Sequence, residues 1–281
     1  MTLKWDGREC WAVVLGASSG FGAAAAKAWA RQGFGIIGVH LDMRATRAAA
    51  EAVRDEIADM GVPVAFYNTN AADDAKREKV IASITEHFEE RRAAGEQPMV
   101  GAVLHSLAFG STLHYITDDE ERKELSRKQM EMTADVMAHS LLYWTRDLYH
   151  ADMLQRGSRV YAMSSEGAML AVPTYGAVSA AKAALEAHVR QLALELADAG
   201  ITVNAIRAGV TDTPALRHIP GWQKLVAAAE ARNPNGRLTT PQDVADALTV
   251  LATPQTHWMT GNIIGVDGGE VMGDRGSADI P

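Results

Sequence analysis

Short apolar runs alternate with longer, helix-forming stretches along almost the whole chain. The first run, residues 11–15, stops at a glycine and is followed by the Ala-rich stretch 23–30, which predicts a strand, a glycine turn and a helix. The later apolar runs predict strands at 35–39, 62–67, 99–105, 159–163, 202–206 and 262–266. The stretches between them predict helices at 45–60, 75–93, 123–155, 176–197 and 241–251.

The predicted strands are too continuously apolar to have one face in water. Such strands are typical of a parallel sheet that right-handed crossovers cover with helices on both faces. No linker, internal repeat or low-complexity tract is evident, so we expect a single α/β domain over residues 1–281. Its one irregular stretch, residues 211–237, holds prolines on both sides of a short amphipathic piece at 222–231.

Composition argues against several kinds of partner. Apolar residues make up 47% and charged residues 22%, which suits a packed globular domain. The formal net charge of −8 repels a phosphate backbone, so nucleic acid is not an expected partner. Cys10 is the single cysteine, and neither a leader segment nor an apolar run of about 18 residues is evident. We therefore expect a cytoplasmic protein that does not enter a membrane.

The nine histidines and many carboxylates do not form a recognisable metal motif. No pair of them has convincing ligand spacing. We therefore expect no catalytic metal.

A glycine-rich segment lies between the first predicted strand and the first helix. It reads Gly-Ala-Ser-Ser-Gly-Phe-Gly over residues 16–22. At this place backbone N–H groups and the positive end of a helix attract a pyrophosphate, so the segment predicts dinucleotide binding. The spacing G-x-x-x-G-x-G also fits a simple tight turn, and the residues further along decide between the two.

A tyrosine and a lysine mark the start of the helix predicted at 176–197. Tyr175 and Lys182 are seven positions apart, about two turns of helix, so their side chains fall near one face. A cation beside a phenol favours the phenolate or strengthens its O–H as a donor, which a reaction that develops negative charge on oxygen requires. Such a pair alone is commonly a surface feature; the glycine segment upstream favours a catalytic pair.

Four segments together resemble the short-chain dehydrogenase/reductase superfamily. They are the glycine segment, the Tyr/Lys helix, Val-Asn-Ala-Ile at 203–206 and Val-Asp-Gly-Gly at 266–269, so the resemblance spans about residues 11–272. It implies a Rossmann-type, doubly wound parallel sheet with helices on both faces and a nicotinamide cofactor. It also implies a homotetramer or homodimer.

Within that superfamily the sequence is most similar to the enoyl-acyl-carrier-protein reductases. Usual members separate the catalytic tyrosine and lysine by three residues, whereas six residues separate Tyr175 from Lys182. His-Ser-Leu-Ala-Phe at 105–109 and Ala-Gly at 208–209 match the enoyl reductase branch, and Thr213 matches a threonine that helps to hold the nicotinamide carboxamide. The glycine segment has the form found in ordinary short-chain reductases, a combination that resembles the type III, NADPH-dependent bacterial enzyme.

The resemblance implies two groups of site residues. The expected catalytic residues are Tyr175, Lys182 and Ser165. The residues expected to bind the cofactor are Gly16, Ser18, Ser19, Gly20, Phe21, Gly22, His40, Arg44, Asn70, Ser106, Leu107, Ala108, Lys182, Ala208, Gly209, Thr211 and Thr213.

The end of the second strand decides which cofactor binds. His40 occupies the usual position of the acid that accepts the ribose hydroxyls of NADH, and Asp42 and Arg44 follow. A carboxylate repels a 2′-phosphate, whereas Arg44 or Arg47 would pair with it. We expect NADPH, with NADH as the alternative.

The expected reaction is reduction of a trans-2-enoyl thioester, carried on acyl carrier protein or coenzyme A, in fatty acid biosynthesis. Hydride would reach the β-carbon and Tyr175 would stabilise the enolate, while Lys182 would bond the nicotinamide ribose. Residues 211–237 would close over the acyl chain as a lid.

Ser165 supports a different reaction. It lies seventeen residues before Lys182, where many enoyl reductases have a second tyrosine and ordinary ketoreductases a catalytic serine. The alternative function is therefore a carbonyl or 3-ketoacyl reductase, or an alcohol dehydrogenase. Ser165 also fits a strand-end serine that bonds local backbone. A nucleotide-dependent regulator without turnover is a third hypothesis.

Overall fold

A sheet of eight strands forms the centre of the computed structural model, which describes residues 2–272. The strands are β1 (Lys4–Trp5), β2 (Arg8–Leu15), β3 (Gly35–His40), β4 (Val64–Asn68), β5 (Pro98–His105), β6 (Arg159–Ser165), β7 (Thr202–Ala208) and β8 (Ile263–Val266). The spatial order is β4-β3-β2-β5-β6-β7-β8 with all neighbours parallel, and the short β1 pairs antiparallel with β2.

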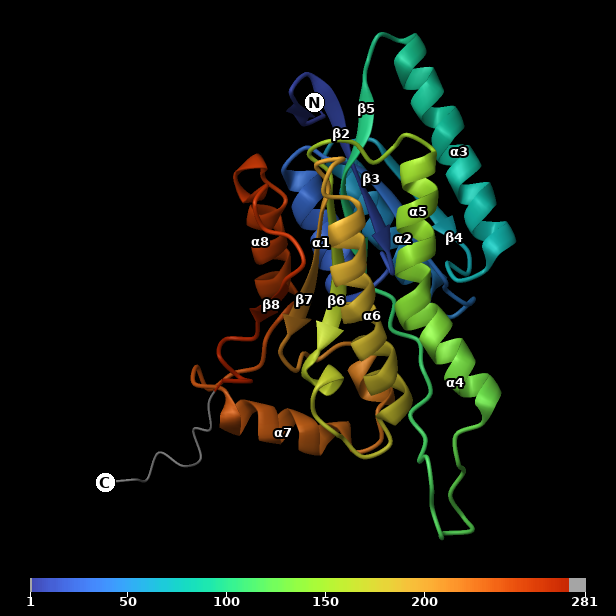
Figure 1. Ribbon diagram of the computed structural model, residues 1–281, viewed down its shortest axis with the longest axis vertical. Coiled ribbons are helices and arrows are strands. Elements are labelled where there is room, and N and C mark those ends of the chain that lie inside the picture. Colours follow the sequence, from blue (N-terminus) through green and yellow to red (C-terminus); the bar gives the residue numbers. More distant parts are fainter. Residues whose placement is uncertain (1, 273–281) are drawn as a thin grey trace.

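Helices cover both faces of this sheet (Figure 1). They are α1 (Gly20–Arg31), α2 (Arg47–Asp59), α3 (Asp74–Ala93), α4 (Arg127–Ala134), α5 (Ser140–His150), α6 (Gly176–Glu195), α7 (Trp222–Arg232) and α8 (Pro241–Leu251), with short turns η1 (Asp135–His139), η2 (Glu166–Ala168), η3 (Leu216–His218) and η4 (Pro254–Thr256). Buried side chains of α3, α5 and α6 share one apolar layer, and those of α1, α2 and α8 share the other. This is the doubly wound arrangement that the sequence predicts.

The strand order reverses between β2 and β5. From β2 the chain adds β3 and β4 on one side and then crosses to add β5, β6 and β7 on the other. In open parallel sheets, ligands bind outside the carboxyl ends of the strands at such a reversal. The segments that follow these strands therefore meet at one edge, and α7 lies beyond it (Figure 1).

Two elements differ from the prediction. The sequence analysis missed β1, because a strand of two residues carries no apolar run. The helix predicted at 123–155 begins later, at Arg127, ends at His150, and is interrupted by the π-helical turn η1. In this turn the Ser140 hydroxyl donates to the Val136 carbonyl at 2.8 Å, and a side chain that bonds the preceding turn in this way often bends a helix.

Cys10 is a packing residue. Its side chain is fully buried in the apolar layer under α1 and α8. Burial raises the pKa of its thiol to about 12, so the reactive thiolate is not populated at neutral pH.

The helices of residues 2–272 include none that is long and apolar enough to cross a bilayer.

Candidate active site

The glycine segment forms a close-packed turn between β2 and α1. Gly16 has a φ of +91°, and a Cβ there would lie 2.6 Å from the backbone oxygen of Ser106, which follows the neighbouring strand β5. A Cβ at Gly22 would collide with the Gly16 carbonyl. Only glycine lets the turn lie this close to both the adjacent strand and the first turn of α1.

The amino end of α1 fits a dinucleotide pyrophosphate. Ser19 is the N-cap residue, its side chain makes no capping hydrogen bond, and the first turn of the helix carries no acidic side chain. The first N–H groups of α1 are therefore available to donate to an anionic ligand. The positive end of the helix attracts such a ligand as well. Thr213, from the segment after β7, lies against Gly20 on the other side of the turn.

Beyond the glycine turn, Asp42 lies just after the carboxyl end of β3. Its carboxylate contacts the buried His40, whose Nδ1 lies 2.8 Å from Oδ2. Burial opposes ionisation of Asp42, but hydrogen bonds from Thr46, Ser18 and His40 outweigh it and lower the pKa of the carboxyl. Asp42 is therefore ionised beside the glycine turn, whereas Arg44 is exposed to solvent.

The other residues expected to bind the cofactor lie at the same edge of the sheet. Asn70 closes a turn, because its side chain accepts from the Ala72 N–H at 3.0 Å. Thr211 donates to the Gly209 carbonyl at 2.9 Å in the segment after β7. The residues directly after β5 are Ser106, Leu107 and Ala108. Strand β7 ends at Ala208 and is followed by Gly209. The residues expected to bind the cofactor, from Gly16 to Thr213, therefore share one edge of the sheet. Contact with a nucleotide stays a prediction for each of them.

Lys182 is a buried ammonium group that joins α6 to β6. Its Nζ donates to the Met163 carbonyl at 2.6 Å. Glu186, one turn further along α6, is also buried and accepts a hydrogen bond from the Ser164 hydroxyl at 2.6 Å. Burial lowers the pKa of Lys182 to about 8, and the charge of Glu186 opposes that shift. Lys182 therefore keeps its positive charge at neutral pH.

Tyr175 lies directly before α6, with its ring packed on the turn that follows β6. A Cβ at Gly167 would lie 2.6 Å from Tyr175 Cε1, so the ring occupies space that only a glycine leaves open. Ser165 Oγ accepts from the Gly167 N–H at 3.1 Å. It also lies 3.5 Å from the place that a Cβ would take at Gly167, where the Tyr175 ring packs. Both hypotheses for Ser165 therefore describe the same side chain: it bonds local backbone and it faces the phenol.

The sequence left two charge states open for Tyr175, a phenolate or an O–H that acts as a strong donor. Burial raises the pKa of Tyr175, the hydrogen bond from Ser165 opposes the rise, and the nearby charge of Glu166 adds to it. The ammonium of Lys182 donates to the Met163 carbonyl of the strand. Tyr175 is therefore a neutral phenol with a proton to donate.

Thr174, the residue before Tyr175, has a strained backbone. Its φ of +64° lies in the left-handed region, which is costly for a β-branched residue. The Thr174 hydroxyl is buried, and within residues 2–272 it has no hydrogen-bond partner. The surrounding packing therefore holds the entry to α6, and with it Tyr175, in one conformation.

Several charged side chains near this edge escaped the sequence analysis. Glu166 follows Ser165, and Arg232 at the end of α7 contacts both Glu166 and the fully buried Glu270. Glu186 has a local signal, since it stands one turn after Lys182 on the same helix. The contacts of Arg232 have no local signal, because Glu166 and Glu270 are 66 and 38 residues away from it in the sequence.

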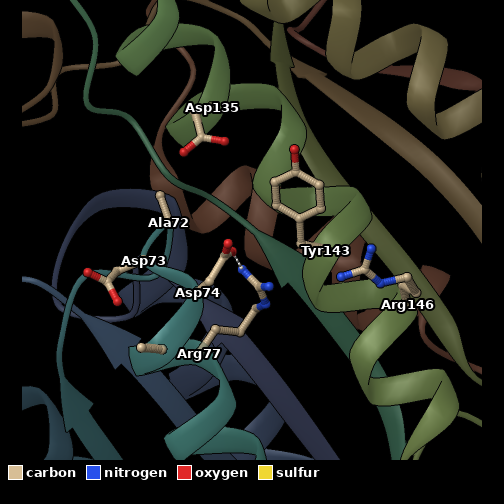
Figure 2. Close-up of a pocket in the computed structure, with 8 residues that line it drawn as sticks. Ala72, Asp73, Asp74, Arg77, Asp135, Tyr143 and Arg146 are labelled. Carbon is tan, nitrogen blue, oxygen red and sulfur yellow. Dashed lines mark hydrogen bonds and ion pairs between the residues drawn. The ribbon is translucent and has the colours of Figure 1, made fainter.

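A separate polar hollow lies between α3 and the α4–α5 segment (Figure 2). Arg77 there binds Asp74 at 2.8 Å and Asp147 at 2.7 Å, and Arg146 binds Asp147 at 3.0 Å. None of the residues predicted to bind cofactor or substrate lines this hollow. Over the described part of the chain, no group of three or more His, Cys, Asp and Glu side chains could hold a metal ion.

Gly167→Ala should displace the Tyr175 ring, because the new methyl group would overlap it. We expect kcat to fall about 10- to 100-fold with the affinity for the nicotinamide cofactor unchanged. Steady-state kinetics and a cofactor fluorescence titration measure the two quantities. Gly7→Ala, at an open turn before β2, is the control for a general loss of stability. Normal turnover in Gly167→Ala would show that the ring position does not matter.

The rate of reduction should depend on the charge of Lys182. The ammonium is present below its pKa of about 8 and is lost above it, so kcat/KM for reduction should fall as the pH rises through about 8. Glu186→Gln removes the carboxylate that raises this pKa and should move the midpoint to lower pH. A pH–rate profile of both proteins checks this, and a midpoint that stays in place in the variant contradicts it.

Comparison with known proteins gives a consistent family. The family model described as enoyl-(acyl carrier protein) reductase matches residues 16–270. Versicolorin reductase stcU of Emericella nidulans is 28% identical, over 95% of this chain and 96% of its own length. The enoyl-acyl-carrier-protein reductase (NADH) FabI of Aquifex aeolicus is 34% identical, but over 61% of this chain and 62% of its own length.

The solved structures agree on the fold. A crystal structure of enoyl-acyl-carrier-protein reductase (NADH) from Aquifex aeolicus superposes with a TM-score of 0.77 and 25% identity, covering 95% of this chain and 98% of its own. Relatives of this group bind nicotinamide nucleotides, and the glycine turn described above fits one. The chain belongs to the short-chain dehydrogenase/reductase superfamily and, within it, to the family whose model is described as enoyl-(acyl carrier protein) reductase.

Proposed function

We propose that the chain reduces a carbonyl group with hydride from a nicotinamide cofactor. The observation that carries this proposal is the place of Ser165 Oγ next to the neutral phenol of Tyr175, with both side chains packed at Gly167. Two hydroxyl groups that meet at one point can bind a carbonyl oxygen and stabilise the alkoxide that forms there. The relative that aligns over nearly the whole chain is named a reductase of versicolorin, which supports the same class of reaction.

Each side chain has a defined role in this reaction. The cofactor, when bound, supplies the hydride. Tyr175 donates its proton to the substrate oxygen, since its raised pKa keeps the phenol protonated until the oxygen becomes basic. Ser165 donates a hydrogen bond to the same oxygen. Lys182 carries a buried positive charge and keeps α6 fixed on β6.

The surroundings of Tyr175 favour an apolar substrate. Phe109 and Tyr115, on the segment between β5 and α4, are exposed, and the Tyr115 ring lies against Gly176 at the start of α6. Met169 and Leu170, between β6 and α6, are also exposed. Exposed apolar side chains on two segments that flank a catalytic group are typical of a surface for an apolar ligand.

Reduction of an enoyl thioester is the second candidate. The six-residue spacing between Tyr175 and Lys182 supports it, as do the description of the matching family model and the partial similarity to FabI. Here Tyr175 would stabilise an enolate oxygen, and Ser165 would have only its contact with the Gly167 N–H.

Matched acetoacetyl and crotonyl thioesters offered to the purified protein separate the two candidates. We expect the keto thioester to be reduced at least about tenfold faster, because the paired hydroxyls suit an alkoxide. Ser165→Ala should lower the rate with the keto substrate about 100-fold, and Tyr175→Phe should abolish it. The assay follows the loss of nicotinamide absorbance.

Other outcomes of this assay have definite meanings. Faster reduction of the crotonyl thioester, unaffected by Ser165→Ala, would replace the first candidate by the second. Cofactor binding without oxidation of either substrate would overturn both and favour a nucleotide-dependent regulator.

We also propose that NADH is the preferred cofactor. The sequence favours NADPH because Arg44 or Arg47 would pair with a 2′-phosphate. The ionised Asp42, however, lies beside the glycine turn, where it can accept the ribose hydroxyls and would repel a 2′-phosphate. Arg44 is exposed, away from the contacts that hold Asp42. The relative FabI is named as an NADH-dependent reductase, which supports the same choice.

Asp42→Ser tests the choice of cofactor. In the wild-type protein kcat/KM should be at least about tenfold higher with NADH, and the variant should lose this preference because the repulsion is gone. Arg44→Ala in the Asp42→Ser background should then weaken the use of NADPH alone. A wild-type preference for NADPH that Arg44→Ala removes would contradict the proposal.

A further inference from the structure

One arginine at the end of the lid helix holds two carboxylates from distant parts of the chain. Arg232 is the last residue of α7. Its Nη2 donates to Glu166 at 2.8 and 2.7 Å and to Glu270 at 2.8 Å. The three side chains, which we call the Arg232 cluster, lie at the edge of the sheet where the cofactor and substrate are expected.

The buried carboxylate makes this cluster more than a surface ion pair. The side chain of Glu270 is 0% exposed, whereas those of Glu166 and Arg232 are 17% and 32% exposed. A buried carboxylate is stable only when it is paired and hydrogen-bonded, and the loss of its partner is strongly destabilising. Glu270 also accepts from the Val210 N–H at 3.0 Å through its other oxygen. Both oxygens of the buried group are therefore used.

Each member of the cluster touches a segment with a role in the reaction. Glu166 directly follows Ser165 and begins the turn that supports Tyr175. Glu270 holds Val210, which follows Gly209 in the segment expected to bind the nicotinamide. Arg232 ends the helix of the segment expected to close over the substrate. One guanidinium therefore connects the lid, the catalytic strand end and the nicotinamide segment.

The two ends of the lid are held in different ways. At the carboxyl end, next to Arg232, the buried Asn233 donates to the Asp267 carbonyl at 2.9 Å, so this end is fixed to the turn after β8. At the amino end, Arg217 binds Asp212 at 2.8 Å, but both side chains are about half exposed and both belong to the lid itself. A pair of this kind contributes little to stability. The lid therefore has a fixed end at Arg232 and a weakly held end near Arg217.

We propose that Arg232 is a positioning residue, the fixed hinge point from which the lid closes over the substrate. It acts through Glu166 and Glu270 and does not touch the reacting atoms. Removal of its charge frees the carboxyl end of α7 and leaves Glu270 unpaired beside Val210. The proposal rests on the chain being a reductase, but it holds equally for a keto or an enoyl substrate.

Limited trypsin digestion tests the hinge without any turnover. Arg217 and Lys224 are exposed cleavage sites inside the lid. In Arg232→Gln, cleavage at these two sites should be about tenfold faster than in the wild-type protein, and Arg232→Lys should restore most of the protection because it keeps the charge. Arg77→Gln is the matched control, since Arg77 also joins two carboxylates, Asp74 and Asp147, but lies on α3 (Figure 2).

Kinetics give the second measurement. With whichever substrate the wild-type protein accepts, Arg232→Gln should raise KM about tenfold and change kcat less than about threefold, because an open lid weakens substrate binding. Arg232→Lys should recover most of the affinity, and Arg77→Gln should leave KM unchanged.

The outcomes are distinguishable from failure of the proposed function. If the wild-type protein reduces no substrate, the proposed function fails, while the digestion still tests the hinge. Equal cleavage of the lid in Arg232→Gln and the wild-type protein would overturn the hinge. So would equal effects of Arg232→Gln and Arg77→Gln on cleavage of the lid, which would indicate a general loss of stability.

Discussion

The buried ammonium of Lys182 is the interaction on which the active site depends. It joins α6 to the Met163 carbonyl of β6, and Glu186 on the same helix joins β6 again through Ser164. These contacts fix the helix against the strand, so the residue before the helix, Tyr175, must lie beside the residue that ends the strand, Ser165. Because a buried charge tolerates few arrangements, the geometry of the two hydroxyls follows from the packing of one lysine.

The parts of the site that the sequence predicts are those with local signals. The glycine turn could be predicted because a chain that passes this close to Ser106 and returns into a helix needs glycine at positions 16 and 22. Tyr175 and Lys182 could be predicted because a helical period relates them. The central strands β2, β3, β5, β6 and β7 could be predicted because burial on both faces makes them continuously apolar, whereas the edge strands β4 and β8 are only partly buried.

The parts that could not be predicted depend on contacts between distant segments. Nothing near Arg232 in the sequence indicates that its partners are Glu166 and Glu270. The sequence shows that Asp42 and Arg44 have opposite effects on a phosphate, but only the contacts with His40 and Ser18 show which side chain faces the glycine turn. The raised pKa of Tyr175 likewise depends on burial and on the charge of Glu166.

The position of the transferred hydride tests the central claim most directly. An α,β-unsaturated ketone offers both a C=O and a C=C group to the same site, and NADH deuterated at the transferable position labels whichever carbon is reduced. We expect deuterium on the carbinol carbon, because the hydroxyls of Ser165 and Tyr175 would both donate to the oxygen of the carbonyl group. Deuterium on the β-carbon, detected by NMR of the product, would contradict it.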